Sequence, residues 1–140
     1  MAETTADDQL WSQVVTLSGR VESGLAKALQ RKHRLGLSEY RALCHLANAD
    51  QGELRMQELA DAVGLNQSSA SRLVARLETV GLTVRDHCPA DRRGVYSVIT
   101  EAGRELQAAA RPTYLETLAA ALDRAAADPD LTTTVKALRG

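Results

Sequence analysis

The sequence has very few aromatic side chains: 3% of its 140 residues are aromatic, and phenylalanine is absent. Its core must therefore be built mainly from leucine, valine and alanine, and the abundance of alanine favours helices. No apolar run approaches the roughly 20 residues that a membrane-spanning helix needs. The acidic, polar segment Met1–Asp8 does not resemble a signal peptide. We therefore expect a cytoplasmic protein that does not contact a membrane.

The chain also lacks a strong charge of either sign. Its formal net charge is −1, so no overall basic field indicates nucleic-acid binding. The distribution is less even, because Asn66–Thr100 carries five arginines against three acidic residues, a local excess of about +2. The charged fraction of 25% is ordinary for a globular protein, and 140 residues fit one domain, 1–140.

Residue clusters typical of catalysis or metal binding are missing as well. The histidines, His33, His45 and His87, are scattered, and periodicity brings no carboxylate or nucleophile close to them. Asp86, His87 and Cys88 are adjacent on a segment expected to be extended, where successive side chains point to opposite faces and cannot converge on one metal. We therefore expect no enzymatic activity, no metal site and no cofactor.

Leucines and valines at steps of three and four predict a long first helix from about Asp7 to His33. Its apolar stripe is about 20 residues or roughly 30 Å long, and needs a partner along its whole length. We expect Gly36 to end this helix and Ser38 to cap a second helix, from Glu39 to about Asn48. The stripe consists of Leu10, Val14, Leu17, Val21, Leu25 and Leu29. The inner face of the second helix would be Tyr40, Leu43, Cys44 and Ala47.

Two shorter helices separated by a tight turn follow. The third helix has Leu59 and Val63 on its inner side and stops at Gly64, after which Asn66 can cap the fourth helix. Small hydroxyls and arginines on the outer face of the fourth helix suit a helix that approaches a major groove closely. Its inner face would be Ala70, Leu73, Val74 and Leu77, and its outer face Ser68, Ser71, Arg72, Ala75 and Arg76.

The C-terminal half predicts a hairpin and two more helices. β-Branched residues at 82–85 and 95–99 flank a loop and indicate the hairpin. Thr100 can cap a long fifth helix, which Pro112 should kink or split. Asp128 and the following proline indicate the start of a last helix. The apolar side of the fifth helix would carry Leu106, Leu115, Leu118 and Leu122, and the last helix carries Leu131, Val135 and Leu138.

Residues 56–100 thus follow the order helix, turn, helix, hairpin of a winged helix-turn-helix, which points to duplex DNA. The chain resembles the MarR-type bacterial transcriptional regulators over nearly its whole length. Asp91-Arg92-Arg93 followed by Val95–Gly103 looks like the D-x-R wing and the following L-T-x-x-G of that family, with Ile99 in place of the usual leucine. The second similar piece consists of Glu58-Leu59-Ala60, Ser71–Val74, Arg76-Leu77-Glu78 and Gly81.

The resemblance implies a mainly α fold with a small β-hairpin. A winged helix-turn-helix core at about 38–100 would be flanked by dimerisation helices at about 7–35 and 104–140. The resemblance also implies a homodimer that binds a palindromic operator in double-stranded DNA. The long apolar stripes agree with this, since a small winged helix cannot cover them and twofold pairing would bury them.

Site residues follow from the same resemblance. Arg72 is expected to contact a base, and Arg76 to serve a phosphate or an internal ion pair. Arg93 matches the family arginine that enters the minor groove, and Asp91 would hold it in position. Ordinary surface or turn roles are the alternative for each. The candidate DNA-binding residues are Ser68, Ser69, Ser71, Arg72, Arg76 and Arg93.

The resemblance further implies a small aromatic or phenolic ligand in a cleft between the dimer body and the winged helix. Core packing or surface is the alternative for its candidate lining residues. Cys44 is expected in the core, and Cys88 exposed near the wing, where oxidation could disturb DNA binding. A cytosolic chain argues against a structural disulfide. The candidate ligand residues are Trp11, Tyr40, His45 and Tyr114.

Two classes of function remain open from the sequence. The first is a dimeric DNA-binding repressor whose affinity is tuned by a ligand. The second is a winged helix that binds another protein, or a ligand-binding module without operator binding. Strong salt dependence of binding to a palindromic duplex would select the first.

Overall fold

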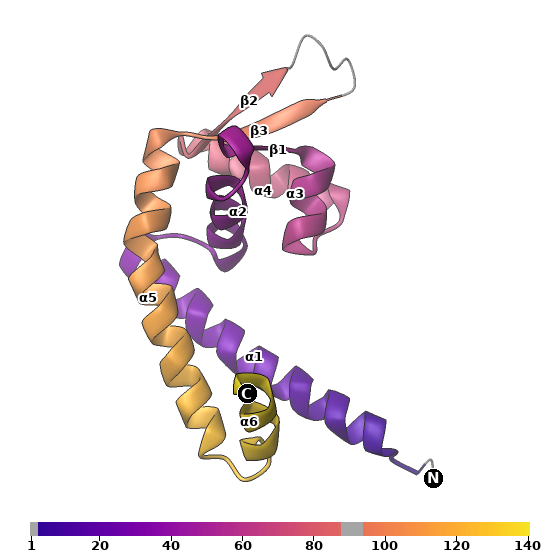
Figure 1. Cartoon of the computed structure of the whole chain (residues 1–140). Coiled ribbons are helices and arrows are strands. Elements are labelled where there is room, and N and C mark those ends of the chain that lie inside the picture. Colours follow the sequence, from indigo (N-terminus) through magenta and orange to yellow (C-terminus); the bar gives the residue numbers. More distant parts are fainter. Residues whose placement is uncertain (1–2, 88–93) are drawn as a thin grey trace.

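The computed structural model describes residues 3–87 and 94–140, which form six α-helices and a three-stranded antiparallel sheet. The long helices α1 and α5 pack against each other and, with α6, form an extended body (Figure 1). The shorter helices and the sheet sit together at the other end of α5. The helices are α1 Ala6–His33, α2 Leu37–Ala47, α3 Met56–Val63, α4 Gln67–Thr79, α5 Glu101–Ala126 and α6 Thr132–Arg139. The strands are β1 Glu53–Arg55, β2 Thr83–His87 and β3 Val95–Ile99.

The expected mainly α fold with a small hairpin is confirmed, and α1 ends at His33 as predicted, but Gly36 is not the residue that terminates it. Arg34, not Gly36, ends the helix in a left-handed conformation with φ of 51°. The backbone N–H of Leu35 then donates to the Leu29 carbonyl at 3.3 Å, and both leucines are buried. This is a Schellman-type end, in which an apolar residue just past the helix returns to the core. The return of Leu35 to the core therefore ends the helix at His33.

The start of α2 was also predicted wrongly. Gly36 is its N-cap, with extended backbone, and Ser38 lies inside the helix rather than capping it. A Cβ atom at Gly36 would lie 2.7 Å from Glu39 Oε1, so the Glu39 side chain covers this position. Because Leu35 has already turned the chain back to the core, the helix can restart two residues earlier than a serine cap would allow.

The core of the winged-helix part is built from leucines of α2, α3 and α4, as the composition predicts. The predicted inner face of α4 is confirmed, with Ala70, Leu73, Val74 and Leu77 buried. The leucines with no exposed surface include Leu43, Leu46, Leu59, Leu73 and Leu77. These residues form one cluster that also contains Tyr40 and Ile99. Burying several leucines on one face fixes α4 so that its opposite face is presented to solvent.

The sheet contains one strand more than the predicted hairpin. β2 and β3 pair antiparallel as expected, with Thr83 opposite Ile99. β1 pairs with the other edge of β3, with Leu54 opposite Ser97, so the strand order is β1-β3-β2. A three-residue strand is too short to show an alternating pattern, so the sequence did not indicate it.

Thr100 and Gly103 join the sheet to α5, and the predicted cap is confirmed. Thr100 Oγ1 accepts a hydrogen bond from Gly103 N at 3.1 Å and donates one to the Gly81 carbonyl at 2.7 Å. The backbone N–H of Thr100 donates to the Leu82 carbonyl at 3.0 Å. The start of α5 is therefore fixed to the turn that follows α4.

Pro112 lies inside α5, which stays continuous and changes direction near its middle (Figure 1). The helix is thus bent and not split, as expected when a proline removes one backbone donor. Of the predicted apolar side, Leu106, Leu118 and Leu122 are half-buried in the single chain, and Leu115 is 45% exposed. The buried positions are mostly small side chains, which allow α5 to lie close to α1. These positions are Gly103, Ala110, Thr113, Ala121 and Ala125.

The start of α6 was predicted too early. Asp128 does not cap this helix: its Oδ1 accepts from Asp130 N at 3.0 Å and its Oδ2 from Arg20 at 2.8 Å. The carboxylate therefore closes a turn and ties it to α1, and the buried Leu131 comes before the first helical residue, Thr132. An aspartate that bonds a backbone N–H two residues on favours a turn over a helix start.

Candidate nucleic-acid interface

A tight turn between α3 and α4 positions the candidate recognition helix. Gly64 ends α3 in the left-handed conformation, with φ of 70°, and the N–H of Leu65 returns to the Ala60 carbonyl at 3.0 Å. Asn66 then caps α4, because its Oδ1 accepts from Ser69 N at 2.9 Å. The predicted stop and cap are both confirmed.

The outer face of α4 carries the predicted DNA-binding side chains. Ser68, Ser71 and Arg72 are exposed, and with Gln67 they line an open cavity of about 460 Å³. Ser69 is half-buried, with its hydroxyl 3.5 Å from Arg72 Nη2, a long contact. No acidic residue lies among these side chains, so the first turns of α4 offer only hydroxyls, an amide and a guanidinium. Such groups can donate to phosphates and base edges.

Arg76 lies one turn further along α4 and near an acidic residue of α2. Its Nε is 3.9 Å from Glu39 Oε1, at the outer limit of an ion pair, and its side chain is 60% exposed. The pair is therefore weak, since an exposed ion pair contributes little in water. The guanidinium of Arg76 remains accessible to a ligand on the outer face.

The last turn of α4 is tied to the hairpin by a closer ion pair. Arg85 Nε lies 2.6 Å from Glu78 Oε1, which joins β2 to α4. Glu78 is the only acidic residue of α4, and this contact holds its carboxylate toward β2. The pair was not predicted from the sequence, because the two residues lie on different elements and share no periodic pattern.

A second missed contact joins the two strands at the other edge of the sheet. Arg55 Nε donates to the Tyr96 hydroxyl at 3.0 Å, and its guanidinium lies 5.6 Å from the centre of the Tyr96 ring. Arg55 and Tyr96 are opposite each other in the β1–β3 register. Only the register reveals this pair, and β1 was not predicted.

Asp91, Arg93 and Cys88, at and near the predicted wing tip, lie outside the described residues.

The candidate ligand residues are brought together only in part. Tyr40 of α2 stacks on Tyr114 of α5, with ring centres 4.9 Å apart, where the winged-helix part meets the long helices. Burial, together with a hydrogen bond to Cys44, raises the pKa of Tyr40 above its ordinary value. His45 is exposed on α2, and Trp11 is 67% exposed near the start of α1.

Within residues 3–87 and 94–140, no three His, Cys, Asp or Glu side chains lie close enough together to hold a metal ion. None of the helices in this part of the chain is both long and apolar enough to cross a membrane.

Cys44 is half-buried, and its sulfur accepts a hydrogen bond from Gln107 Nε2 at 3.5 Å. Its expected role as a small packing residue fits its contact with the winged-helix core.

Comparison with known proteins places this fold in a family. The model of the MarR family matches residues 35–94. Sco3205, a MarR family transcriptional regulator from Streptomyces coelicolor solved in complex with DNA, is 30% identical, with a TM-score of 0.80 over 99% of this chain and 87% of its own. AbsC, a second MarR family regulator from that organism, is 29% identical, with a TM-score of 0.81 over 99% of this chain and 93% of its own.

A more distant structure shows the same fold. Bordetella bronchiseptica BpsR, whose DNA binding is regulated by 6-hydroxynicotinic acid, is 22% identical, with a TM-score of 0.76 over 99% of this chain and 96% of its own. No curated protein sequence is significantly similar to the chain. The family match to the winged-helix part and the full-length similarity to Sco3205 agree. The chain belongs to the MarR family of transcriptional regulators.

Proposed function

We propose that the protein is a cytoplasmic transcriptional repressor that binds a palindromic operator in double-stranded DNA as a homodimer. The outer face of α4 carries this proposal. Its first turns offer serines and Arg72 without an acidic neighbour, while the inner face anchors the helix in the core. A helix held in this way can enter a major groove with its N-terminal turns leading. The DNA-bound structure of Sco3205 supports the proposal.

Each candidate residue then has a role in DNA binding. Arg72 addresses a base edge, because it lies in the leading half of α4 and its guanidinium can bind guanine O6 and N7 together. Arg76, one turn further from the N-terminus, binds a phosphate. Arg93 enters the minor groove with Asp91 as its support, a role carried over from the family motif. Ser68, Ser69 and Ser71 bind phosphates or base edges.

Exposed apolar side chains on the long helices support the homodimer. Trp11 and Val15, one helical turn apart on α1, are 67% and 54% exposed. Leu10 of α1, Leu115 of α5 and Leu138 of α6 are also exposed. Among the described residues, five of the seven exposed large apolar side chains lie on α1, α5 and α6, the other two being Val80 and Val84, and this concentration supports an interaction surface. In a twofold dimer the same surface of each copy covers that of the other.

We further propose that a small aromatic or phenolic ligand releases the DNA by binding beside Tyr40 and Tyr114. This aromatic stack joins α2 to α5 and thus the winged-helix part to the long helices. A ligand that changes the stack would change how α4 is held. The regulation of BpsR by 6-hydroxynicotinic acid supports a ligand of this class. Trp11 and His45 would line the ligand site only if the dimer brings them to it.

The testing experiment is a titration of the protein with the duplex that lies upstream of its own gene and with a scrambled duplex. We expect preferential binding to a palindrome in the first duplex and a steep loss of affinity with salt. Equal, weak binding to both duplexes would contradict operator recognition. It would leave the protein-interaction or ligand-binding module as the better description.

A further inference from the structure

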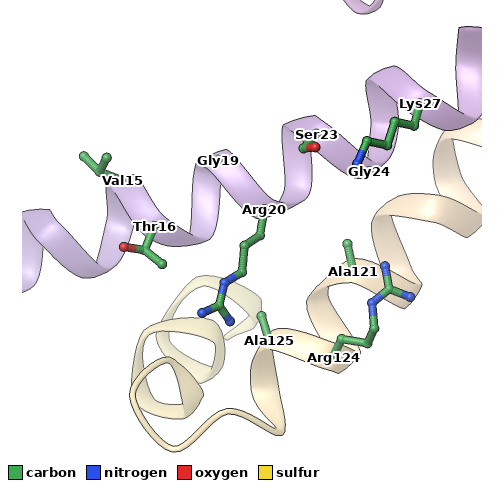
Figure 2. Close-up of a pocket in the computed structure, with 10 residues that line it drawn as sticks. All are labelled: Val15, Thr16, Gly19, Arg20, Ser23, Gly24, Lys27, Ala121, Arg124 and Ala125. Atoms are coloured by element: carbon green, nitrogen blue, oxygen red, sulfur yellow. The ribbon is translucent and has the colours of Figure 1, made fainter.

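The open groove of about 680 Å³ between α1 and α5 (Figure 2) belongs to the body formed by the long helices. Its lining includes Val15, one of the exposed apolar side chains that the proposed dimer covers, so its openness in the single chain does not indicate a ligand site. The winged-helix part, by contrast, carries an exposed cation outside α4. This cation is Arg55, the last residue of β1.

Arg55 lies at the end of the sheet that leads to the wing. It is opposite Tyr96 of β3, and Tyr96 is opposite Asp86, the last residue but one of β2. Arg55 also directly precedes α3, the helix that the tight turn joins to α4. Figure 1 shows the start of α3 on the same side of the molecule as the ends of β2 and β3 that lead to the wing, and away from α5. Arg55 therefore stands between the wing and the helix-turn-helix.

Both the backbone and the side chain of Arg55 are held in place. Its backbone N–H donates to Glu58 Oε1 at 3.1 Å, where α3 starts. Its Nε donates to the Tyr96 hydroxyl at 3.0 Å, and its guanidinium lies over the Tyr96 ring, 5.6 Å from the ring centre. The bond to Tyr96 uses Nε and not the Nη donors, which can bind phosphate oxygens. A side chain that is already held loses less rotamer freedom when a ligand binds.

The position of Arg55 matches the phosphate backbone of DNA better than the bases. A helix in the major groove and a wing beside it leave phosphates between them, and arginines there fix the protein on the duplex without reading sequence. An arginine that stacks on an aromatic ring is a common arrangement in nucleic-acid recognition. Each further phosphate that a protein neutralises raises its affinity and steepens its salt dependence.

We propose that Arg55 binds a phosphate of the DNA backbone beside the wing, with Tyr96 as its positioning residue. The inference rests on the proposed DNA binding and adds to it one phosphate contact in each subunit, outside both α4 and the wing tip. The ligand group is a phosphodiester, which accepts hydrogen bonds from the guanidinium through its two unbridged oxygens. Tyr96 keeps the guanidinium at the wing end of the sheet and does not itself contact the DNA.

The experiment uses the full chain, a duplex from upstream of its own gene and a scrambled duplex, titrated at several salt concentrations. Arg55→Gln should weaken binding to both duplexes by the same factor, at least about fivefold, and flatten the salt dependence by about 0.9 in each subunit. The matched control is Arg41→Gln, which removes an arginine of α2 that pairs with Glu22 of α1 at 2.9 Å. It should change either affinity by less than about twofold.

Tyr96→Phe tests the positioning role, because it keeps the ring and removes the hydroxyl. It should lower both affinities by a smaller factor than Arg55→Gln and leave the slope of the salt dependence unchanged, since the charge of Arg55 remains. In the Arg55→Gln protein, Tyr96→Phe should have no further effect, because both changes act on the same contact. An equal loss in both backgrounds would overturn the positioning role.

The NMR signal of the Arg55 Nε–H group in the unaltered protein gives a result that does not depend on the folding of any variant. We expect it to shift in a saturable way when the scrambled duplex is added at low salt, and to return when salt is raised. An unshifted signal, or an Arg55→Gln protein with unchanged affinity and salt slope, would overturn the inference. Equal, weak binding of the unaltered protein to both duplexes would instead contradict operator recognition, and the Arg55 signal would still decide the phosphate contact.

Discussion

Gly103 lies directly against the carbonyl oxygen of Leu82, so closely that a Cβ atom at residue 103 would overlap this oxygen. The glycine is part of the segment that matches the family's L-T-x-x-G motif, and its place in the structure gives that motif a physical reason. The threonine bonds the turn after α4, and the glycine lets α5 start against it.

We expect Gly103→Ala to lower the free energy of unfolding by about 1–3 kcal/mol, because the added methyl group displaces backbone. The higher helix propensity of alanine, worth about 1 kcal/mol, offsets part of the loss. Urea denaturation measures the change. Ala102→Ser, at the exposed neighbouring position, is the control and should stay within about 0.5 kcal/mol. A stabilised Gly103→Ala would show that the contact relaxes easily.

A second prediction separates base reading from phosphate binding on α4. Arg72→Ala should lower the affinity for the cognate duplex strongly and the affinity for a scrambled duplex little, since a base contact carries sequence information. Arg76→Ala should weaken both duplexes about equally and flatten the salt dependence by roughly 0.9 per lost phosphate contact in each subunit. Titrations at several salt concentrations measure both effects. The opposite pattern would mean that the two roles are exchanged.

The wing provides a third prediction. Arg93→Ala should weaken operator binding by about 1–3 kcal/mol while leaving the dimer and its melting intact. Asp91→Ala should cause a smaller loss, because the arginine remains but is held less firmly. Binding titrations together with thermal melts distinguish these effects. Unchanged affinity of Arg93→Ala would remove the wing from the interface.

The fourth prediction concerns assembly. Because Trp11 and Val15 are exposed on α1, the protein should sediment as a dimer at micromolar concentration without DNA. Val15→Asp should shift it toward monomer, since a carboxylate would be buried without a partner. Fluorescence of Trp11, the single tryptophan, should report the change. A stable, folded monomer of the unaltered protein would refute the proposed dimer.

The fifth prediction uses the ion pair between Arg20 and Asp128. The hydrogen bond from Arg20 lowers the pKa of Asp128 below its ordinary value, with a further contribution from Asp130 N. The carboxylate therefore stabilises the folded state at neutral pH, and this contribution is lost as the pH falls through the lowered pKa. Asp128→Asn should be less stable than the unaltered protein at pH 7 and similar to it at the acid end. Denaturation curves at several pH values measure the difference, and a pH-independent difference would contradict this role.

Local signals predicted most of the winged-helix part. The buried face of α4, its cap at Asn66 and the stop at Gly64 each depend on residues only a few positions apart. The cap of α5 at Thr100 is local in the same sense. These elements agree with the sequence because local preference and burial favour the same arrangement.

The predictions from sequence are wrong where contacts with residues elsewhere in the chain determine the local conformation. Arg34 adopts a left-handed conformation because Leu35 must return to the core, and Asp128 forms a turn that Arg20 stabilises from another helix. β1 forms only because β3, about forty residues further along the chain, supplies its pairing partner. The register of that pair depends on burial and on turns elsewhere in the chain, which residues 53–55 alone do not show. For the same reason the contacts of Arg55 with Tyr96 and of Arg85 with Glu78 could not be found from the sequence.

The bend of α5 at Pro112 has a geometric consequence for the proposed dimer. Thr100 and Pro112 are twelve residue steps apart, about 18 Å along the helix axis. The start of α5 is fixed to the winged-helix part at Thr100 and Gly103, so this half of the helix carries the winged helix with it when the bend changes. A change of roughly 5° in the bend angle of α5 at Pro112 would move the Thr100 end of the helix by about 1.6 Å. With one such arm in each subunit of the proposed dimer, the bend of α5, together with the contact of Tyr40 with Tyr114 beyond the proline, sets the separation of the two recognition helices and so the operator spacing that they match.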